Sequence, residues 1–231
     1  MARKKQTRGK CAFCGREMTR GGMSLHLRAC PERKAAMKTA SQESGKEQTL
    51  YTLQVRDASS GNYWLYLEMK GSARLADLDR YLRAIWLECC GHLSQFSISG
   101  RLGEKIPMSR RINRVFGSGD SNVELTHIYD FGTSSYTLVR ALDTRQGKPL
   151  TLHPIYLMAR NNPPEILCIE CGEPASWLCV QCLYETETSG AFCEEHIQEH
   201  RMHDDYGPPM EIVNSPRLGM CAYSGPAEPP Y

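Results

Sequence analysis

Short apolar segments between residues 48 and 160 predict a series of β-strands. Runs such as YTLQVRD and YWLYLEMK have strand length and are bounded by turn residues. These two runs flank Ser59, Ser60, Gly61 and Asn62, which predicts a hairpin. The expected strands cover residues 51–57, 63–70, 92–98, 122–131, 136–142 and 151–160.

One segment has helical periodicity instead. In LADLDRYLRAIWLECC the apolar residues recur every three or four positions, and Gly91 follows as a stop, so we expect one main helix. Neighbouring side chains on a helix diverge, so Cys89 and Cys90 are not expected to face one metal ion, and Cys89 is expected in the core. The helical face comprises Leu75, Leu78, Leu82, Ile85, Trp86 and Cys89.

Polar and proline-rich segments divide the rest of the chain. Residues 31–47 begin at Pro31 and lack large aliphatic side chains, which indicates a linker or a short frayed helix. Pro163 and Pro164 end the middle domain, because consecutive prolines continue neither a strand nor a helix. The expected organisation is a basic arm (1–10), a finger (11–30), the linker (31–47), a middle domain (48–160), a cysteine-rich module (161–206) and a Pro-rich tail (207–231).

Composition narrows the class of protein. The 231 residues are 41% hydrophobic, enough for one domain with smaller modules or for two domains. The chain has no run of eighteen apolar residues and no apolar stretch of a signal peptide, so we expect a soluble cytoplasmic protein with no membrane partner. The chain has eleven cysteines, and in such a chain cysteines at ligand spacing indicate metal binding rather than disulfides.

The net charge of +2 hides a gradient along the chain. Residues 1–38 contain eleven Lys or Arg and two acids, a net charge of +9. Residues 39–160 have a net charge of +3, and residues 161–231, with two Arg and twelve acids, have −10. A basic segment attracts phosphate and an acidic one repels it, so different partners are expected at the two ends.

The most specific motif lies between Cys168 and His203. Four pairs of ligands, each with two residues between its members, supply eight ligands, and Zn²⁺ takes four, so two ions are expected. A helix would place Cys193 and His203 about 15 Å apart, too far for one ion. We therefore expect interleaved sites, one with Cys168, Cys171, Cys193 and His196 and the other with Cys179, Cys182, His200 and His203.

This interleaved spacing resembles a B-box zinc finger, a cross-braced module that commonly mediates protein association. The resemblance covers 36 residues and all eight ligand positions, although the ten-residue gap before Cys193 is slightly long for that family. It implies an unidentified protein partner. Protein side chains fill every metal position, which predicts a structural role, and zinc would supply folding energy that the few apolar residues of the module do not.

A second cysteine cluster, CAFCGREMTRGGMSLHLRAC, lies near the N-terminus. Cys11 and Cys14 form a knuckle, and His26 and Cys30 are four residues apart, on one face of a helix expected after Gly22. The spacing predicts a third zinc ion. The stretch also resembles Cys-Cys-His-Cys fingers, including the Cys-Gly-Arg after the knuckle.

Basic residues surround this finger and indicate a phosphate-binding surface. A basic arm beside a finger is a common way to bind DNA or RNA, with affinity from counterion release. The alternatives are a solvated tail and an arm that folds back on the acidic module. The expected nucleic-acid contacts are Arg3, Lys4, Lys5, Arg8, Lys10, Arg16, Arg20 and Arg28.

The middle domain resembles a known family. YTLQVRD, YLRAIWLECCGHLSQFSI and HIYDFGTSSYTL are similar to the Ri-plasmid ORF-three-like family, found on plasmids and as passenger proteins of insertion elements. The resemblance spans residues 48–160 and implies an α+β domain with a mixed or antiparallel sheet, flanked here by two small zinc-binding modules. It implies no reaction. Thr133, Ser134 and Ser135 stand where the family often has acidic and aromatic residues.

The sequence contains no strong catalytic signature. His92, His127, Asp130 and His153 are the obvious catalytic candidates of the middle domain, but no phosphate loop, nucleophile elbow or His-Glu-x-x-His helix accompanies them. The sequence therefore predicts a non-enzymatic zinc-binding adaptor with three Zn²⁺ ions, associated with nucleic acid at one end and with protein at the other. The alternatives are a purely protein-binding module and an accessory nuclease or hydrolase with a site in the middle domain.

Overall fold

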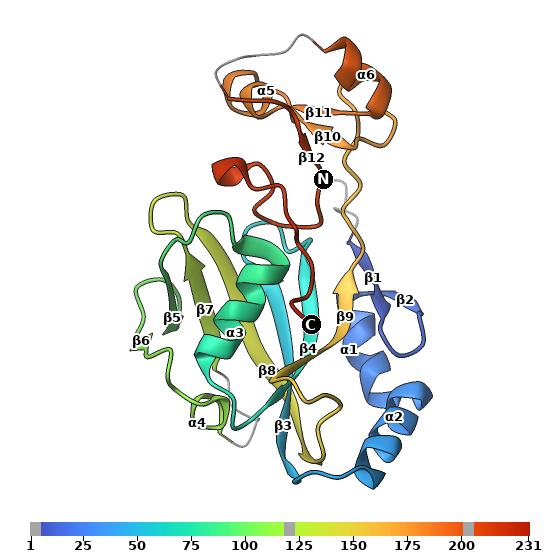
Figure 1. Cartoon of the computed structure of the whole chain (residues 1–231), viewed down its shortest axis with the longest axis vertical. Helices are drawn as coiled ribbons and strands as arrows, with labels where there is room; N and C mark the ends of the chain where they lie inside the picture. Colours follow the sequence, from blue (N-terminus) through green and yellow to red (C-terminus); the bar gives the residue numbers. More distant parts are fainter. Residues whose placement is uncertain (1–5, 118–122, 201–205) are drawn as a thin grey trace.

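The computed structural model describes residues 6–117, 123–200 and 206–231 (Figure 1). A nine-stranded sheet forms the body of the molecule, and a three-stranded sheet belongs to a small cysteine-rich module at one end. Within the described ranges, no helix is both long and apolar enough to cross a lipid bilayer.

Every strand pairing in the large sheet is antiparallel, which confirms an α+β fold with an antiparallel sheet. The strand order is β2-β1-β9-β4-β3-β8-β7-β5-β6. The sequence pattern indicates β3, β4, β5, β7, β8 and β9 but not β1, β2 and β6. The strands are β1 (Arg8–Cys11), β2 (Glu17–Thr19), β3 (Gln48–Asp57), β4 (Trp64–Lys70), β5 (Ser94–Ile98), β6 (Lys105–Ile106), β7 (Glu124–Tyr129), β8 (Ser135–Gly147) and β9 (Ile155–Asn161).

Strand β4 is buried on both faces of the sheet. Leu65, Leu67 and Met69 point to one face and join the large core. Trp64 and Tyr66 point to the other and join a second core with residues of the finger. A strand covered on both faces needs a nearly continuous apolar run, which explains the sequence WLYLEM.

Helix α3 (Leu75–Leu82) covers the first face and continues into a π-helical turn, Arg83–Leu87. The chain leaves the helix there, so residues 88–91 are not helical. The expectation of one main helix is not confirmed, because α1 with 10 residues and α2 with 12 are both longer than α3 with 8. A short helix, α4 (Ile112–Phe116), packs its apolar residues into the same core.

Helices α1 (Arg20–Ala29) and α2 (Pro31–Gln42) belong to the finger side of the sheet. Met23 and Leu27 of α1 are buried in the second core with Trp64 and Tyr66 of β4. Helix α2 occupies most of the segment expected as a linker or short frayed helix. Its first residue is proline, whose fixed φ suits that position.

Strand β1 joins the finger to the large sheet by pairing with β9. A Cβ at Gly9 would lie 2.2 Å from the Arg160 carbonyl oxygen and 2.5 Å from the Trp64 ring, so only glycine permits this approach. Arg8 and Lys10 therefore lie in a strand of the sheet rather than in a free arm.

The cysteine-rich module contains the second sheet, with strand order β11-β10-β12. Its third strand comes from the segment expected as a Pro-rich tail. The elements are β10 (Trp177–Leu178), α5 (Val180–Glu185), β11 (Ala191–Phe192), α6 (Glu194–Glu199) and β12 (Met210–Glu211).

The segment after β12 runs back along the face that carries α3 (Figure 1). The Ser215 hydroxyl donates a hydrogen bond of 2.6 Å to the Trp86 carbonyl oxygen. Arg217 and Tyr223 are buried. The C-terminal segment is therefore part of the body of the protein.

A buried ion pair connects the finger side to the sheet, and its removal should destabilise the fold. Glu68 of β4, 3% exposed, accepts two hydrogen bonds of 2.8 and 2.7 Å from Arg145 and lies 3.7 Å from Arg33 of α2, which is 7% exposed. Glu68→Ala leaves these guanidinium groups without their carboxylate, so we expect the free energy of unfolding to fall by about 3–5 kcal/mol. Urea unfolding in zinc-containing buffer measures this. Glu47→Ala, at an exposed position, is the control and should change stability by less than about 0.5 kcal/mol.

Candidate metal centres

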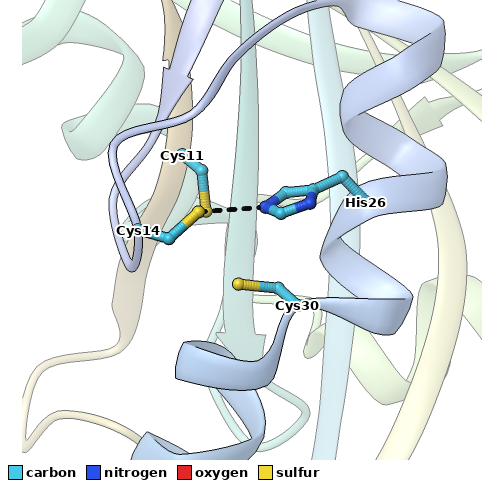
Figure 2. A group of neighbouring side chains, drawn as sticks. All are labelled: Cys11, Cys14, His26 and Cys30. Atoms are coloured by element: carbon cyan, nitrogen blue, oxygen red, sulfur yellow. Dashed lines mark hydrogen bonds between the residues drawn. The ribbon is translucent and has the colours of Figure 1, made fainter.

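Four ligands of the finger converge between β1 and α1 (Figure 2). Cys11 ends β1, Cys14 lies in the following turn, His26 lies on α1 and Cys30 directly follows this helix. Their ligand atoms lie within 4.8 Å of one another, and Cys14 Sγ is 3.2 Å from His26 Nε2. These are the four residues that the spacing assigns to one zinc ion.

Local hydrogen bonds shape both halves of this cluster. The Gly15 N–H donates to the Cys11 carbonyl oxygen at 2.9 Å, and the φ of Gly15, 72°, lies in the left-handed region that favours glycine. The Cys30 N–H donates to the His26 carbonyl oxygen at 2.8 Å. These backbone hydrogen bonds thus fix the turn after Cys11 and the end of α1, from which the four ligand side chains point toward one another.

The cysteine-rich module brings the first and third ligand pairs together. Cys168, Cys171, Cys193 and His196 place their ligand atoms within 4.8 Å of one another. Cys171 Sγ lies 3.8 Å from Cys193 Sγ, and His196 Nδ1 lies 3.1 Å from Cys193 Sγ and 3.7 Å from Cys168 Sγ. This is the grouping that interleaving requires for its first site.

The second pair forms another cluster in the same module. Cys179, Cys182 and His200 have ligand atoms within 4.8 Å, with Cys182 Sγ 3.6 Å from His200 Nε2. Cys179 is the N-cap of α5, and Cys182 lies in its first turn. His203, the fourth ligand expected here, lies outside the described residues.

The separations between ligand atoms fit tetrahedral zinc. With bonds of about 2.3 Å to sulfur and 2.0–2.1 Å to nitrogen, a tetrahedral site has edges of about 3.8 Å between sulfurs and about 3.6 Å between sulfur and nitrogen. The Cys171–Cys193, Cys168–His196 and Cys182–His200 separations of 3.8, 3.7 and 3.6 Å match these edges, whereas the Cys14–His26 and Cys193–His196 separations of 3.2 and 3.1 Å are shorter. Thiolate and imidazole donors are also those that Zn²⁺ prefers. The clusters could therefore hold metal ions and are compatible with zinc-binding modules.

Burial and backbone hydrogen bonds shift the pKa values of the thiols in these clusters in opposite directions. Burial raises the pKa of Cys30 and of Cys182 to about 11. Burial also acts to raise the pKa of Cys168, but backbone hydrogen bonds from Cys171 and Cys193 lower it to about 6. A metal ion must displace the protons of Cys30 and Cys182, so metal affinity should weaken as pH falls.

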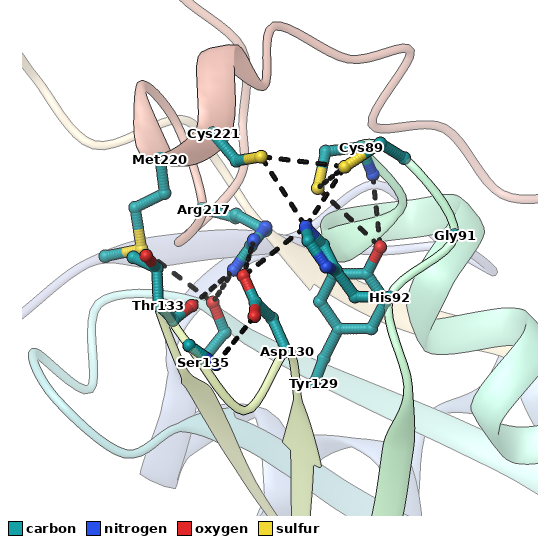
Figure 3. A network of polar contacts seen from close by, with 12 residues as sticks. Cys89, Gly91, His92, Tyr129, Asp130, Thr133, Ser135, Arg217, Met220 and Cys221 are labelled. Carbon is teal, nitrogen blue, oxygen red and sulfur yellow. Dashed lines mark hydrogen bonds and ion pairs between the residues drawn. The ribbon is translucent and has the colours of Figure 1, made fainter.

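A fourth cluster lies on the large domain, where none was expected (Figure 3). Cys89, Cys90, His92 and Cys221 have ligand atoms within 4.8 Å of one another. The expectation that Cys89 and Cys90 diverge as neighbours on a helix was wrong, because the helix ends at Leu87 and their sulfur atoms lie 3.7 Å apart. In the sequence, the run Cys89-Cys90-Gly91-His92 was the available signal of a metal site here. Cys221 lies far away in the sequence and has no ligand motif around it.

The structure brings two of the four catalytic candidates together, with His92 Nε2 3.5 Å from Asp130 Oδ2, and leaves His127 and His153 apart from them. His127 is fully buried, with Nε2 2.7 Å from Asp79 Oδ1, and burial lowers its pKa. The carboxylate of Asp130 accepts a hydrogen bond from Arg217, and the exposed His153 stacks on Tyr231. Of the four candidates, only His92 joins a ligand cluster. That the protein has no catalytic residue stays a prediction.

The expected phosphate-binding residues lie around the finger. The described ones, with the exception of the half-buried Arg20, are exposed, and most contact neighbouring backbone or acids. Arg8 donates to the Glu17 carbonyl oxygen, and Lys10 lies 3.6 Å from the Glu17 carboxylate. Arg28 donates to the Leu142 carbonyl oxygen at 3.3 Å. Arg3, Lys4 and Lys5 lie outside the described residues.

No protein-family model and no curated protein sequence matches this chain. A crystal structure of a protein of unknown function from Methanosarcina mazei Go1 is similar to it in part. That similarity has a TM-score of 0.40 and 14% sequence identity, and it covers 69% of this chain and 86% of the other. The resemblance of residues 48–160 to the Ri-plasmid ORF-three-like family therefore stays a prediction.

Interleaving predicts which substitutions in the module share a metal ion. Cys171→Ala and His196→Ala should each remove one zinc ion per chain, and the double variant should also remove only one, because both ligands serve the same ion. Cys171→Ala with Cys182→Ala should remove two. Elemental analysis of purified variants checks this. Loss of two ions in the Cys171/His196 double variant would instead support sequential sites.

Proposed function

We propose that the protein is a non-enzymatic zinc-binding adaptor. Its finger binds DNA or RNA, and its acidic C-terminal module binds a protein partner. The observation that carries this proposal is the charge of the two cysteine-rich regions, since residues 1–38 have a net charge of +9 and residues 161–231 have −10. A basic region attracts the phosphates of nucleic acid and an acidic region repels them, so the two cysteine-rich regions favour different classes of partner.

The exposed face of the finger supports nucleic-acid binding. Arg16, Lys34 and Lys38 project from the finger and from α2 as exposed cations. Lys34 lines a hollow of about 420 Å³ together with Arg28, Arg33 and Arg145, with Asp143 as the acidic member of the lining. Arg33 and Arg145 are also paired with Glu68, so Arg28 and Lys34 are the cations of this hollow that are available to phosphate. A basic, hollowed surface of this kind suits a phosphate backbone rather than a particular base sequence.

The surface of the C-terminal module favours a protein partner. Leu167, Ile169 and Tyr184 are 48%, 38% and 54% exposed, an unusual extent for apolar residues of so small a module. Exposed carboxylates surround them and would repel nucleic acid. These are Glu170, Glu173, Glu185, Glu187, Glu194, Glu195 and Glu199.

The ligand sets support a structural role for the metal. A zinc ion held by four protein side chains has no coordination position for water or substrate. Residues 48–160 resemble the Ri-plasmid ORF-three-like family, which supports a protein encoded on a mobile genetic element such as a plasmid. In this proposal the middle domain is a scaffold that carries both binding regions.

Salt-dependent binding tests the nucleic-acid role. In fluorescence anisotropy with mixed DNA and RNA probes, log affinity should fall with log salt concentration at a slope of about −3 to −5. A variant with Lys10→Gln, Arg16→Gln and Arg28→Gln should flatten this slope by up to about three, because each lost phosphate contact removes about one released counterion.

The matched control carries the same change of charge at the opposite edge of the sheet. Arg101→Gln, Lys105→Gln and Arg110→Gln alter exposed cations near β6, whereas the finger lies at the β2 edge. This control should bind like the wild type. Equal loss in both variants would indicate a non-specific charge effect, and absence of binding at low salt would favour the purely protein-binding alternative.

Affinity capture from nuclease-treated native cells tests the protein-binding role. Partners of the module should survive nuclease treatment and be lost from a variant with Glu170→Gln, Glu173→Gln and Glu187→Gln, because these exposed carboxylates belong to the proposed surface. The finger variant described above is the control and should retain them. Partners lost with nuclease in every sample would mean that only the nucleic acid links them to this protein.

A further inference from the structure

The fourth cluster joins two segments that are far apart in the sequence. Cys89, Cys90 and His92 lie in the loop after the π-helical turn, and Cys221 lies in the C-terminal segment, 131 residues after Cys90. Cys90 Sγ lies 3.7 Å from Cys89 Sγ and 3.6 Å from Cys221 Sγ. These separations are too long for disulfides, whose sulfurs are about 2.05 Å apart.

The separations agree instead with the edges of a zinc tetrahedron. The two sulfur–sulfur distances are close to the expected value of about 3.8 Å. His92 Nε2 lies 3.5 Å from Cys221 Sγ, close to the expected sulfur–nitrogen edge of about 3.6 Å, and 3.0 Å from Cys90 Sγ, which is shorter than that edge. Three thiols and one imidazole form the same donor set as the finger, so the same class of metal ion suits both clusters.

We propose that Cys89, Cys90, His92 and Cys221 bind a fourth zinc ion, which fastens the C-terminal segment to the large domain. The run Cys89-Cys90-Gly91-His92 is the local sequence signal for this site, and the site is separate from the three sites of the proposed adaptor. Cys90 and Cys221 are exposed, so an ion can enter from solvent.

A buried polar network surrounds the cluster and positions its ligands (Figure 3). Arg217, 0% exposed, donates to Asp130 Oδ2 at 2.7 Å and also contacts the Cys89 thiol. Its guanidinium lies 4.9 Å from the centre of the Tyr129 ring, and the Tyr129 hydroxyl lies 3.7 Å from Cys89 Sγ. Three thiolates and Zn²⁺ have a net charge of −1, and the Arg217 guanidinium, which also pairs with the Asp130 carboxylate, offsets part of the negative charge beside it.

The backbone at Cys221 indicates that a ligand fixes this segment. Cys221 and Ala222 have φ values of 52° and 53°, in the left-handed region that residues other than glycine rarely adopt. Such conformations persist where surrounding interactions impose them. A metal bond through the Cys221 thiol supplies that interaction at an otherwise exposed position.

The same segment also touches the C-terminal module. A Cβ at Gly219 would meet the side chains of Leu178 at 2.8 Å and Leu183 at 3.0 Å, and the Tyr184 hydroxyl donates to the Gly219 carbonyl oxygen at 3.5 Å. Cys221 lies two residues after Gly219. A zinc ion bound to Cys221 therefore fixes the C-terminal segment, which contacts both the large domain and the C-terminal module.

Zinc content tests whether the fourth site exists. The full chain, purified without chelators, should contain four zinc ions, and Cys221→Ala and His92→Ala should each contain three. The double variant should also contain three, because both ligands serve one ion. Ser224→Ala, an exposed change near Cys221, is the matched control and should keep four. Unchanged zinc content in Cys221→Ala, or a mass and thiol count that show a disulfide at Cys221 in the wild type, overturns the proposal.

Tryptic cleavage after Arg217 tests whether this ion fastens the segment. Arg217 is fully buried, so cleavage requires local opening. With zinc present, Cys221→Ala should be cleaved there at least about tenfold faster than the wild type or Ser224→Ala. Cys221→His supplies another zinc ligand and should restore both the fourth ion and the protection. Equal cleavage rates in Cys221→Ala and the wild type overturn the fastening role.

Discussion

The burial of β4 on both faces is the constraint on which the rest of the structure depends. Its residues Leu65 and Leu67 require a cover on one side of the sheet, and Trp64 and Tyr66 require one on the other. Helix α3 and the C-terminal segment cover the first side, and the finger covers the second. The large sheet is therefore covered by segments near the two ends of the chain, and the described residues 6–30 and 212–231 belong to the body of the protein.

The finger and the C-terminal segment, which cover the two faces, are both small, and a Cys/His cluster lies where each of them meets the large domain. In the finger, the cluster joins β1 to α1 directly beside the core that contains Trp64. On the opposite side, Cys221 of the C-terminal segment meets the loop after Leu87. Short segments bury too little apolar area to hold themselves in place, whereas a metal bond fixes several residues at once. Two of the clusters therefore lie where short segments of the chain join the large sheet.

The sequence predicts the local features well and the long-range ones poorly. Ligand spacing within a few residues fixes the finger, because Cys11, Cys14, His26 and Cys30 lie in one continuous segment. Periodicity likewise locates the long strands. It does not reveal that β1 pairs with β9, or that Cys221 reaches Cys90, because these contacts depend on how the sheet closes rather than on a local repeat. The end of the helix was missed because Cys89 continues the apolar spacing although the backbone leaves the helix at Leu87.

The two cysteine-rich regions differ in how far the loss of a bound metal ion would disturb the rest of the protein. The finger shares a core with the sheet, since Met23 and Leu27 pack against Trp64, so a disordered finger exposes β4 itself. The C-terminal module has its own small core of Cys179, Cys182 and Phe192. Because Cys179 and Cys182 also belong to a Cys/His cluster, a metal ion bound there would be coupled to the module's own small core, while the large core keeps its own contacts. A metal ion bound at the finger would instead be coupled to the stability of the whole sheet.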